Sequence, residues 1–250
     1  MNILITGGNS DIAQAMAVVY HELGHSLTMT ATSEQSCNKM HETFQKMNIP
    51  IQSLIFDLRS PENNTQKLEE LLLSGHFQGL ILNACTAVEK RLTFHEYSEK
   101  DWASELNDNI LGNIWILKRI LPSMKEQQFG RILFISSVTA ISGTSKYAPY
   151  SLSKSAIESV MENIAVDYGH DGITANILRP GIVKTSRTEK YWKNEKYEKV
   201  FGRSIPSGRL ATPQDIAMSS RIFLDKLNYS NGTSLNVSGG LPLVKSKGSL

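Results

Sequence analysis

The sequence has little cysteine, no metal-binding motif and no long apolar run, and each absence excludes a class of protein. Only Cys37 and Cys85 are cysteines among 250 residues, and we expect both to be reduced. Neither CxxC nor HExxH occurs, so we expect no bound metal. No apolar stretch approaches the roughly 18 residues that span a bilayer. A strand-like run begins at Ile3, which leaves no room for a signal peptide, and together these features predict a cytoplasmic protein with no membrane partner.

An excess of charge of one sign is also lacking. Lysine and arginine number 26 against 24 acidic residues, and the basic residues are scattered along the chain. In the densest basic run, residues 190–199, lysines alternate with glutamates, as is typical of a solvated helix face. We therefore expect no nucleic-acid partner. No linker or change of composition divides the chain, which predicts a single domain over residues 1–250.

Short runs rich in β-branched and apolar residues alternate with longer helical patterns. Helical spacing of apolar residues is clearest in three places. The first follows the first strand-like run and ends at Gly24, and the others are residues 102–125 and 149–168. Pro149 lies in the first turn of the last of these helices. This alternation predicts an α/β fold, a doubly wound seven-stranded parallel sheet with helices on both faces. The expected strands are 3–6, 26–32, 51–57, 79–84, 131–137, 174–180 and 234–237.

A glycine-containing turn, TGGNSDIA, directly follows the first expected strand and opens the first helix. A dinucleotide pyrophosphate binds at such a turn, because the backbone can approach the phosphates and the helix N-terminus favours an anion. An ordinary strand-to-helix turn is the alternative interpretation of this motif taken alone.

Tyr150 and Lys154 lie four residues apart in the sequence YSLSK, and Ser137 lies thirteen residues before Tyr150. A helix places residues i and i+4 on one face, where an ammonium favours the phenolate and lowers the phenol's pKa from about 10. Tyr150 is then able to exchange a proton near neutrality, and Ser137 is able to hold a substrate oxygen. A chance pair on a solvated helix is the alternative for this spacing alone.

In their order along the chain, these motifs resemble the short-chain dehydrogenase/reductase family over nearly its full length. Further matches are LNAC at 82–85, NDNILGN around Asn109, PGIVKT at 180–185, IPSGRLATPQDIA and LNVSGG. The resemblance implies a Rossmann fold and hydride transfer between a nicotinamide and a carbonyl. The catalytic residues that it implies are Asn109, Ser137, Tyr150 and Lys154, with Tyr150 as proton donor and Asn109 holding a water that links Lys154 to solvent.

The resemblance also implies a set of cofactor-binding residues, in which Asp57 lies next to the adenine and Thr185 orients the carboxamide. The set is Gly7, Asn9, Ser10, Asp11, Ile12, Thr32, Ser33, Asp57, Leu58, Asn83, Ala84, Tyr150, Lys154, Pro180, Gly181, Ile182 and Thr185. Asp11, Ala13 and Cys85 stand where the family has glycine. We expect Asp11 to turn away from the diphosphate and cap the first helix.

The second expected strand ends in Ala31, Thr32 and Ser33, without the acid that accepts the ribose hydroxyl of NAD. NADP(H) is therefore favoured. NAD(H) is the alternative, because Glu34 follows these residues and the TGGNSDIA loop has no Arg or Lys to neutralise a 2'-phosphate. The overall pattern is most similar to the 3-oxoacyl-acyl-carrier-protein reductases. This similarity implies that the protein reduces a 3-oxoacyl thioester and that acyl carrier protein is a candidate partner.

Two other functions stay open: a dehydrogenase of a sugar, polyol or other secondary alcohol, and a noncatalytic dinucleotide-binding regulator. The family position of residues 186–206 implies a substrate lid, with Tyr191, Trp192, Tyr197 and Phe201 either as its apolar walls or as packing. The family's assembly implies a homotetramer or a dimer.

Overall fold

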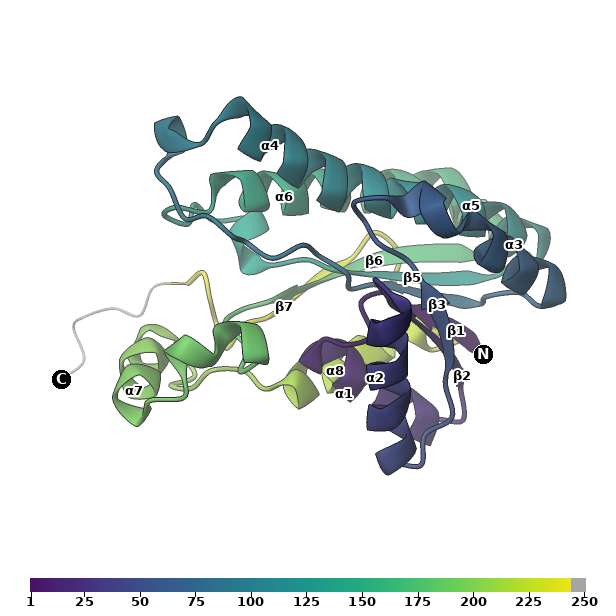
Figure 1. Cartoon of the computed structure of the whole chain (residues 1–250), viewed down its shortest axis with the longest axis horizontal. Coiled ribbons are helices and arrows are strands. Elements are labelled where there is room, and N and C mark those ends of the chain that lie inside the picture. The colour runs from purple at the N-terminus through teal and green to yellow at the C-terminus, as the bar shows by residue number, and fades with distance from the viewer. Residues whose placement is uncertain (244–250) are drawn as a thin grey trace.

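The computed structural model describes residues 1–243, without the side chains of residues 64, 65, 67 and 74. One parallel sheet forms the centre of the molecule (Figure 1). Its order, β3-β2-β1-β4-β5-β6-β7, confirms the predicted doubly wound seven-stranded sheet. The strands are β1 (Asn2–Ile5), β2 (Ser26–Ala31), β3 (Gln52–Ile55), β4 (Gly79–Leu82), β5 (Gly130–Ile135), β6 (Ile173–Pro180) and β7 (Ser234–Val237).

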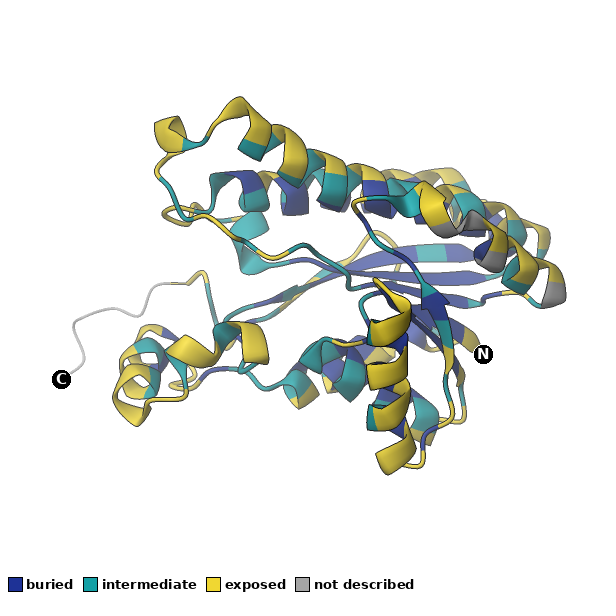
Figure 2. Ribbon diagram, in the orientation of Figure 1, coloured by how far each residue is buried: buried dark blue, intermediate teal, exposed yellow. Residues whose placement is uncertain are grey.

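Helices cover both faces of the sheet (Figure 1). One face carries α1 (Asp11–Glu22), α2 (Glu34–Lys46) and α8 (Pro213–Leu224); the other carries α3 (Thr65–Ser74), α4 (Glu99–Leu106), α5 (Gly112–Glu126) and α6 (Ala148–Tyr168). Each helix layer shares one cluster of buried apolar side chains with the sheet. The inner strands are almost wholly buried (Figure 2), whereas the edge strands β3 and β7 are partly exposed. None of the helices in the described part of the chain is long and apolar enough to cross a membrane.

The chain reverses direction along the sheet at β1, which pairs with β2 on one side and with β4 on the other. The chain after β1 and the chain after β4 therefore lead to helices on opposite faces of the sheet (Figure 1), and this leaves a crevice at the carboxyl edge of the strands, where doubly wound sheets bind their ligands. The sequence motifs at residues 6–13 and 82–85 follow these two strands. The fold thus brings them together.

The prediction of one continuous helix over residues 102–125 is wrong, because the helix is interrupted. A π-helical turn, Asn107–Leu111, separates α4 from α5. The wide turn is stabilised by side chains, since the Asn113 amide donates to the backbone carbonyl of Asn109 at 2.7 Å. It leaves the side chain of Asn109 buried and pointing toward the sheet edge, and such turns occur frequently at functional sites.

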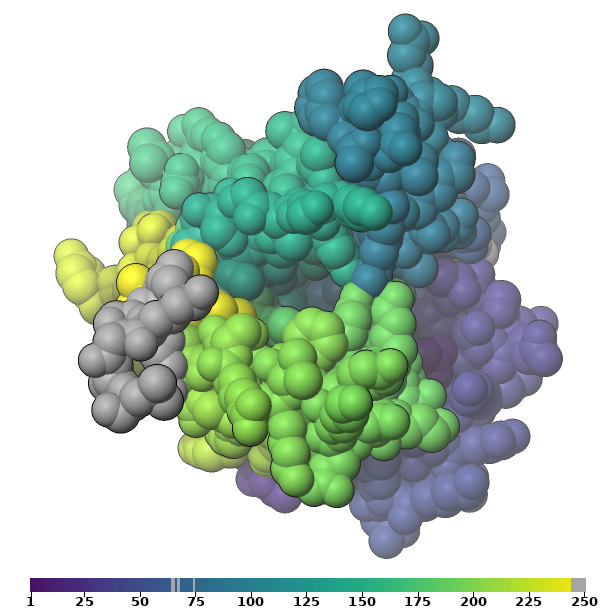
Figure 3. All heavy atoms as spheres, turned by 90° about the vertical axis from the view of Figure 1, so that its left-hand side faces the viewer, coloured from purple at the N-terminus to yellow at the C-terminus, as the bar shows by residue number. Residues whose placement is uncertain are grey.

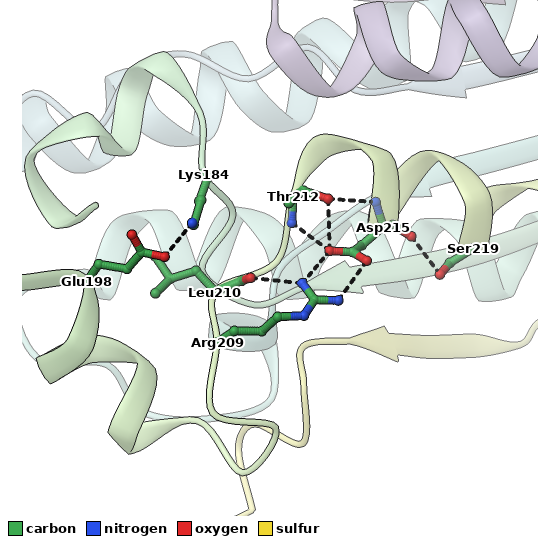
Figure 4. A network of polar contacts seen from close by, with 7 residues as sticks. All are labelled: Lys184, Glu198, Arg209, Leu210, Thr212, Asp215 and Ser219. Atoms are coloured by element: carbon green, nitrogen blue, oxygen red, sulfur yellow. Dashed lines mark hydrogen bonds and ion pairs between the residues drawn. The ribbon is translucent and has the colours of Figure 1, made fainter. Parts of the chain in front are cut away.

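Two ion pairs hold the chain between β6 and α8 (Figure 4). Lys184, in the turn after β6, reaches Glu198 on α7 (Glu195–Ser204). Arg209 makes a two-pronged contact with Asp215 in the first turn of α8, at 2.7 and 2.9 Å, and lowers the pKa of that carboxyl. The same carboxylate accepts from Thr212, the N-cap of α8, so the segment that carries α7 is fixed at both ends.

Candidate active site

The loop after β1 approaches the loop after β4 very closely. Gly7 adopts a φ of +72°, and a Cβ on it would lie 3.0 Å from the Cα of Ala84. Asn83 ties the two loops together, because its amide donates to the Thr6 carbonyl at 3.0 Å and to the Ser10 hydroxyl at 2.9 Å. A glycine is therefore required at position 7, and the structure brings the predicted residues Gly7, Ser10, Asn83 and Ala84 into one place.

The N-terminus of α1 differs from the sequence prediction, because Ser10 and not Asp11 is the N-cap. The Ser10 hydroxyl accepts from the backbone N–H of Ala13 at 3.2 Å. Asp11 turns outward, where its carboxylate accepts from the backbone N–H of Ser186 at 3.0 Å and from its hydroxyl at 2.8 Å. The physical reason is that Ser10 occupies the extended N-cap conformation, while Asp11 is already helical.

Backbone N–H groups at this helix end fit a dinucleotide pyrophosphate. Among the described residues, no acceptor contacts the N–H of Asp11 or of Ile12. Free amides at a helix N-terminus next to the sheet's switch point are the donors that a diphosphate uses. The nearby Asn9 side chain donates instead to the carbonyl of Ser36 on α2, at 3.0 Å, and leaves these amides open.

The residues predicted around the adenosine lie along the next strands. Thr32 and Ser33 are exposed after β2, and Ser33 caps α2 by accepting from the N–H of Ser36 at 3.2 Å. Asp57 follows β3 and pairs with Arg59 at 2.6 Å, and this hydrogen bond lowers the pKa of Asp57. Leu58 is buried against α5, where a Cβ on Gly112 would lie 2.6 Å from its carbonyl oxygen. The exposed hydroxyls of residues 32 and 33 are the polar groups at the end of β2.

Ser137, Tyr150 and Lys154 meet at the carboxyl end of β5. The Ser137 hydroxyl accepts from the N–H of Thr139 at 3.2 Å, which fixes it at the start of a short turn. Tyr150 and Lys154 lie one turn apart on α6, as predicted. The Lys154 ammonium is buried, donates to the Ile135 carbonyl at 3.1 Å and lies 5.7 Å from the centre of the Tyr150 ring.

The pKa of Tyr150 differs from the sequence prediction. Burial raises it above its usual value of about 10, the neighbouring Cys85 raises it further, and a hydrogen bond with Ser137 opposes this only in part. The Lys154 ammonium is directed to the backbone carbonyl of Ile135. Tyr150 is therefore a protonated phenol at neutral pH, the form that donates a proton.

Asn109 belongs to a buried polar network that includes a carboxylate. Its amide donates to Glu105 at 2.8 Å and to the Thr86 hydroxyl at 2.7 Å, and its oxygen accepts from the N–H of Thr86. Glu105 also accepts from Ser153, beside Lys154, at 3.0 Å; burial raises its pKa, and the Ser153 and Asn109 hydrogen bonds oppose the rise. Glu105 was not predicted from the sequence, although its position one helical turn before Asn109 could have indicated it.

The turn after β6 lies at the same sheet edge. Pro180 ends β6, and the N–H of Gly181 donates to the Val237 carbonyl at 3.1 Å. The carbonyl of Ile182 accepts from the N–H of Ala211 at 3.0 Å, while Thr185 begins the 3-10 helix Ser186–Tyr191. Trp192 fixes this turn, since its indole donates to the Thr185 carbonyl at 3.0 Å.

Comparison with known proteins agrees with this arrangement. A family model described as short chain dehydrogenase matches residues 1–196. The chain belongs to the short-chain dehydrogenase family. A 3-oxoacyl-acyl-carrier-protein reductase of Buchnera aphidicola subsp. Acyrthosiphon pisum is 28% identical over 96% of each chain. A tropinone reductase homologue of Arabidopsis thaliana is 27% identical over 96% of this chain and 79% of its own. The solved structure "ElxO with NADP bound" is 25% identical, with a TM-score of 0.87 over 96% and 97% of the two chains.

In this short-chain dehydrogenase, the segment after β6 faces residues 137–150 across a recess (Figure 3). Two arginines that were not predicted from the sequence reach across it. Arg187 donates to the Cys85 carbonyl at 3.0 Å, and Arg91 donates to the Tyr191 hydroxyl. The aromatic residues predicted for the lid differ in their surroundings: the Tyr191 and Phe201 rings meet edge to face with their centres 4.8 Å apart, whereas Tyr197 is 53% exposed.

Proposed function

We propose that this short-chain dehydrogenase reduces a ketone to a secondary alcohol with NADPH, and that Tyr150 donates the proton. The observation that carries the proposal is the position of Tyr150. It is a half-buried, protonated phenol beside Ser137, on the helix that also carries Lys154, at the sheet edge where the free amides of α1 are found. A site with these groups is suited to an acid-assisted hydride transfer.

The roles of the side chains follow from their positions. When bound, the nicotinamide supplies the hydride, and the ketone oxygen becomes the atom that needs a proton. Ser137 holds this oxygen and Tyr150 donates to it. Lys154 holds the nicotinamide ribose, and Asn109 with Glu105 and Ser153 forms the polar route by which a proton returns to Tyr150 from solvent. Ile182 and Thr185 orient the carboxamide.

The cofactor that we propose is NADP(H), with NAD(H) as the alternative. No acid follows β2, and the hydroxyls of Thr32 and Ser33 are exposed there beside the N-terminus of α2. A helix N-terminus with hydroxyl donors suits a 2'-phosphate. The NADP bound in the ElxO structure supports the same choice.

For the substrate, we propose a ketone such as a 3-oxoacyl thioester, with acyl carrier protein as its carrier. The support is the likeness to 3-oxoacyl-acyl-carrier-protein reductases over 96% of the chain. The tropinone reductase homologue keeps a second candidate open, a reductase or dehydrogenase of another carbonyl or secondary alcohol, such as a sugar or polyol. A noncatalytic regulator is less well supported, because the four proposed catalytic side chains are present.

We further propose that residues 186–206 form the substrate lid of a single-domain enzyme. A homotetramer is also proposed, because apolar side chains are exposed on α6, at Leu152 and Val166, and in the π-helical turn before α5, at Leu111. A dimer is the alternative, and the cytoplasmic location stays a prediction from the sequence.

The experiment is a titration of purified protein with NADPH and with NADH by fluorescence, followed by addition of an acetoacetyl thioester. Loss of reduced nicotinamide in the wild type but not in Tyr150→Phe supports the proposal. Binding of NADPH without turnover on any ketone or alcohol would favour the regulator, and no binding of either nucleotide would contradict the enzyme.

A further inference from the structure

A half-buried guanidinium lies one aromatic ring away from Tyr150. Arg91 belongs to the long loop after β4, and its guanidinium carbon lies 4.9 Å from the centre of the Tyr147 ring. The Tyr147 ring in turn lies 6.1 Å from the Tyr150 ring. A small molecule is therefore long enough to contact both the Arg91 guanidinium and Tyr150, the proposed proton donor.

The charge of Arg91 has no acidic partner among the residues that the structure describes. Its neighbour Lys90 pairs with Asp101 at 2.6 Å, and the arginines 59, 179 and 209 each pair with a carboxylate, but no ion pair is formed by Arg91. The partner of Arg91 is instead the neutral hydroxyl of Tyr191. A guanidinium that has donors left over and no carboxylate beside it is able to bind an anionic ligand.

The surroundings of Arg91 suit an oxyanion. Tyr147 and Tyr191 flank it, with the Tyr191 ring centre 5.6 Å from the guanidinium carbon. The Arg91 guanidinium donates to the Tyr191 hydroxyl and lies against the Tyr147 ring, so the three side chains meet in one place. Desolvation would raise the pKa of Tyr191, but its hydrogen-bonding neighbours hold it below the usual value. The guanidinium fork supplies several donors, and the Tyr191 hydroxyl, which accepts from Arg91, keeps its own hydrogen to donate. Ring contacts hold both tyrosines, Tyr191 against Phe201 and Tyr147 against Tyr150.

We propose that Arg91, Tyr147 and Tyr191 form an anion-recognition site of the active-site cleft, and that the ketone substrate carries a carboxylate or phosphate close to its carbonyl. This inference rests on the proposed ketone reduction. The anion binds the guanidinium while the carbonyl lies against Tyr150, so the site selects both the substrate and its orientation. A long neutral acyl chain would have to desolvate Arg91 without compensation, so this inference favours a small anionic ketone over the 3-oxoacyl thioester as the substrate.

The test compares matched pairs of ketones with NADPH. Pyruvate, acetoacetate and levulinate are each paired with their methyl esters, and dihydroxyacetone phosphate with dihydroxyacetone, so that carboxylate and phosphate are distinguished. In the wild type we expect kcat/KM for at least one anion to exceed that of its neutral partner about tenfold or more. Arg91→Gln should remove that preference, and Arg91→Lys should keep part of it. Lys90→Gln, which deletes the adjacent charge, should keep it all.

The outcomes separate this inference from other possibilities. If Arg91→Gln lowers kcat/KM equally for anions and neutral partners, Arg91 only tethers the lid, and the inference is wrong. If the neutral partners are the better substrates, it is also wrong. If NADPH reduces no ketone, the proposed function fails, and thermal shift then tests the site by itself: an oxo acid or phosphate should raise the melting temperature of the wild type more than that of Arg91→Gln, and equal shifts would overturn the inference.

Discussion

The carboxylate of Asp11 holds Ser186 by two hydrogen bonds, of 3.0 Å from the backbone N–H and 2.8 Å from the hydroxyl. Asp11 begins the helix next to the proposed pyrophosphate site, and Ser186 begins the segment that we propose as the lid. Where the family has a small glycine, this chain thus has a tether between the two sides of the cofactor site. The acid that was unexpected in a phosphate loop has a structural partner.

Loss of this tether should loosen residues 186–191. Asp11→Ala removes a charged acceptor, and we expect trypsin to cleave after Arg187 and Lys190 about tenfold faster, since such hydrogen bonds contribute about 1.5–3 kcal/mol. Asp11→Asn keeps one acceptor oxygen and should give an intermediate rate, while Glu22→Gln at the far end of α1 should not change it. Equal rates for all of them would mean that the contact does not hold the segment.

The raised pKa of Tyr150 has a spectroscopic signature. Burial keeps the phenol protonated. We therefore compare the absorbance of tyrosinate, at about 295 nm, in the wild type and in Tyr150→Phe as the pH is raised. The difference between the two proteins should show no ionisation of Tyr150 up to about pH 10, the usual pKa of tyrosine. An ionisation step near pH 7 in the free protein would instead support the lowered pKa inferred from the Tyr150 and Lys154 spacing.

Glu105 should make stability depend on pH in a defined direction. Its pKa in the folded protein is raised above the usual value of about 4.3, so the native state retains a proton that the unfolded chain loses. This contribution is present at low pH and is lost as pH rises through the folded pKa. Glu105→Gln should therefore gain stability relative to the wild type between pH 4 and pH 8, as measured by melting temperature. A constant difference would contradict the assignment.

The buried pair of Arg179 and Glu158, with contacts of 2.6 and 2.8 Å, should be costly to break. Arg179→Met leaves the Glu158 carboxylate buried with only the Ser136 hydroxyl, at 2.5 Å, and should lower the free energy of unfolding by about 3–5 kcal/mol. Arg59→Met breaks the largely exposed pair with Asp57 and should cost about 1 kcal/mol or less. Denaturant unfolding measures both, and similar losses would show that burial does not decide the cost.

Cofactor choice should reverse at the end of β2. Thr32→Asp places a carboxylate where the ribose 2'-substituent of the cofactor is proposed to bind, so it should weaken NADPH and favour NADH, with a change in the ratio of dissociation constants of about tenfold or more. Gln35→Asp, on the exposed first turn of α2, is a control for the added charge. An unchanged ratio of dissociation constants in Thr32→Asp would show that the 2'-phosphate does not bind at the end of β2.

The sequence was sufficient for the sheet and for the order of its motifs, because apolar runs, glycine turns and helix spacing are local signals. Strand ends shifted by at most two residues, and the π-turn at Asn109 was missed because it depends on side-chain bonds with Asn113 and Glu105. The cap was assigned to Asp11 instead of Ser10, since the competing partner, Ser186, lies 175 residues away. Arg91 carried no local pattern at all, and only the fold brings it to Tyr147 and Tyr191.

The most direct test of the central claim is the transfer of deuterium from NADPH labelled at the reactive carbon of its nicotinamide. The account predicts that wild-type protein delivers the label to the carbinol carbon of the alcohol product, and that Tyr150→Phe binds NADPH with similar affinity but transfers no label. A product without deuterium, or full transfer by Tyr150→Phe, would contradict a reduction in which Tyr150 supplies the proton.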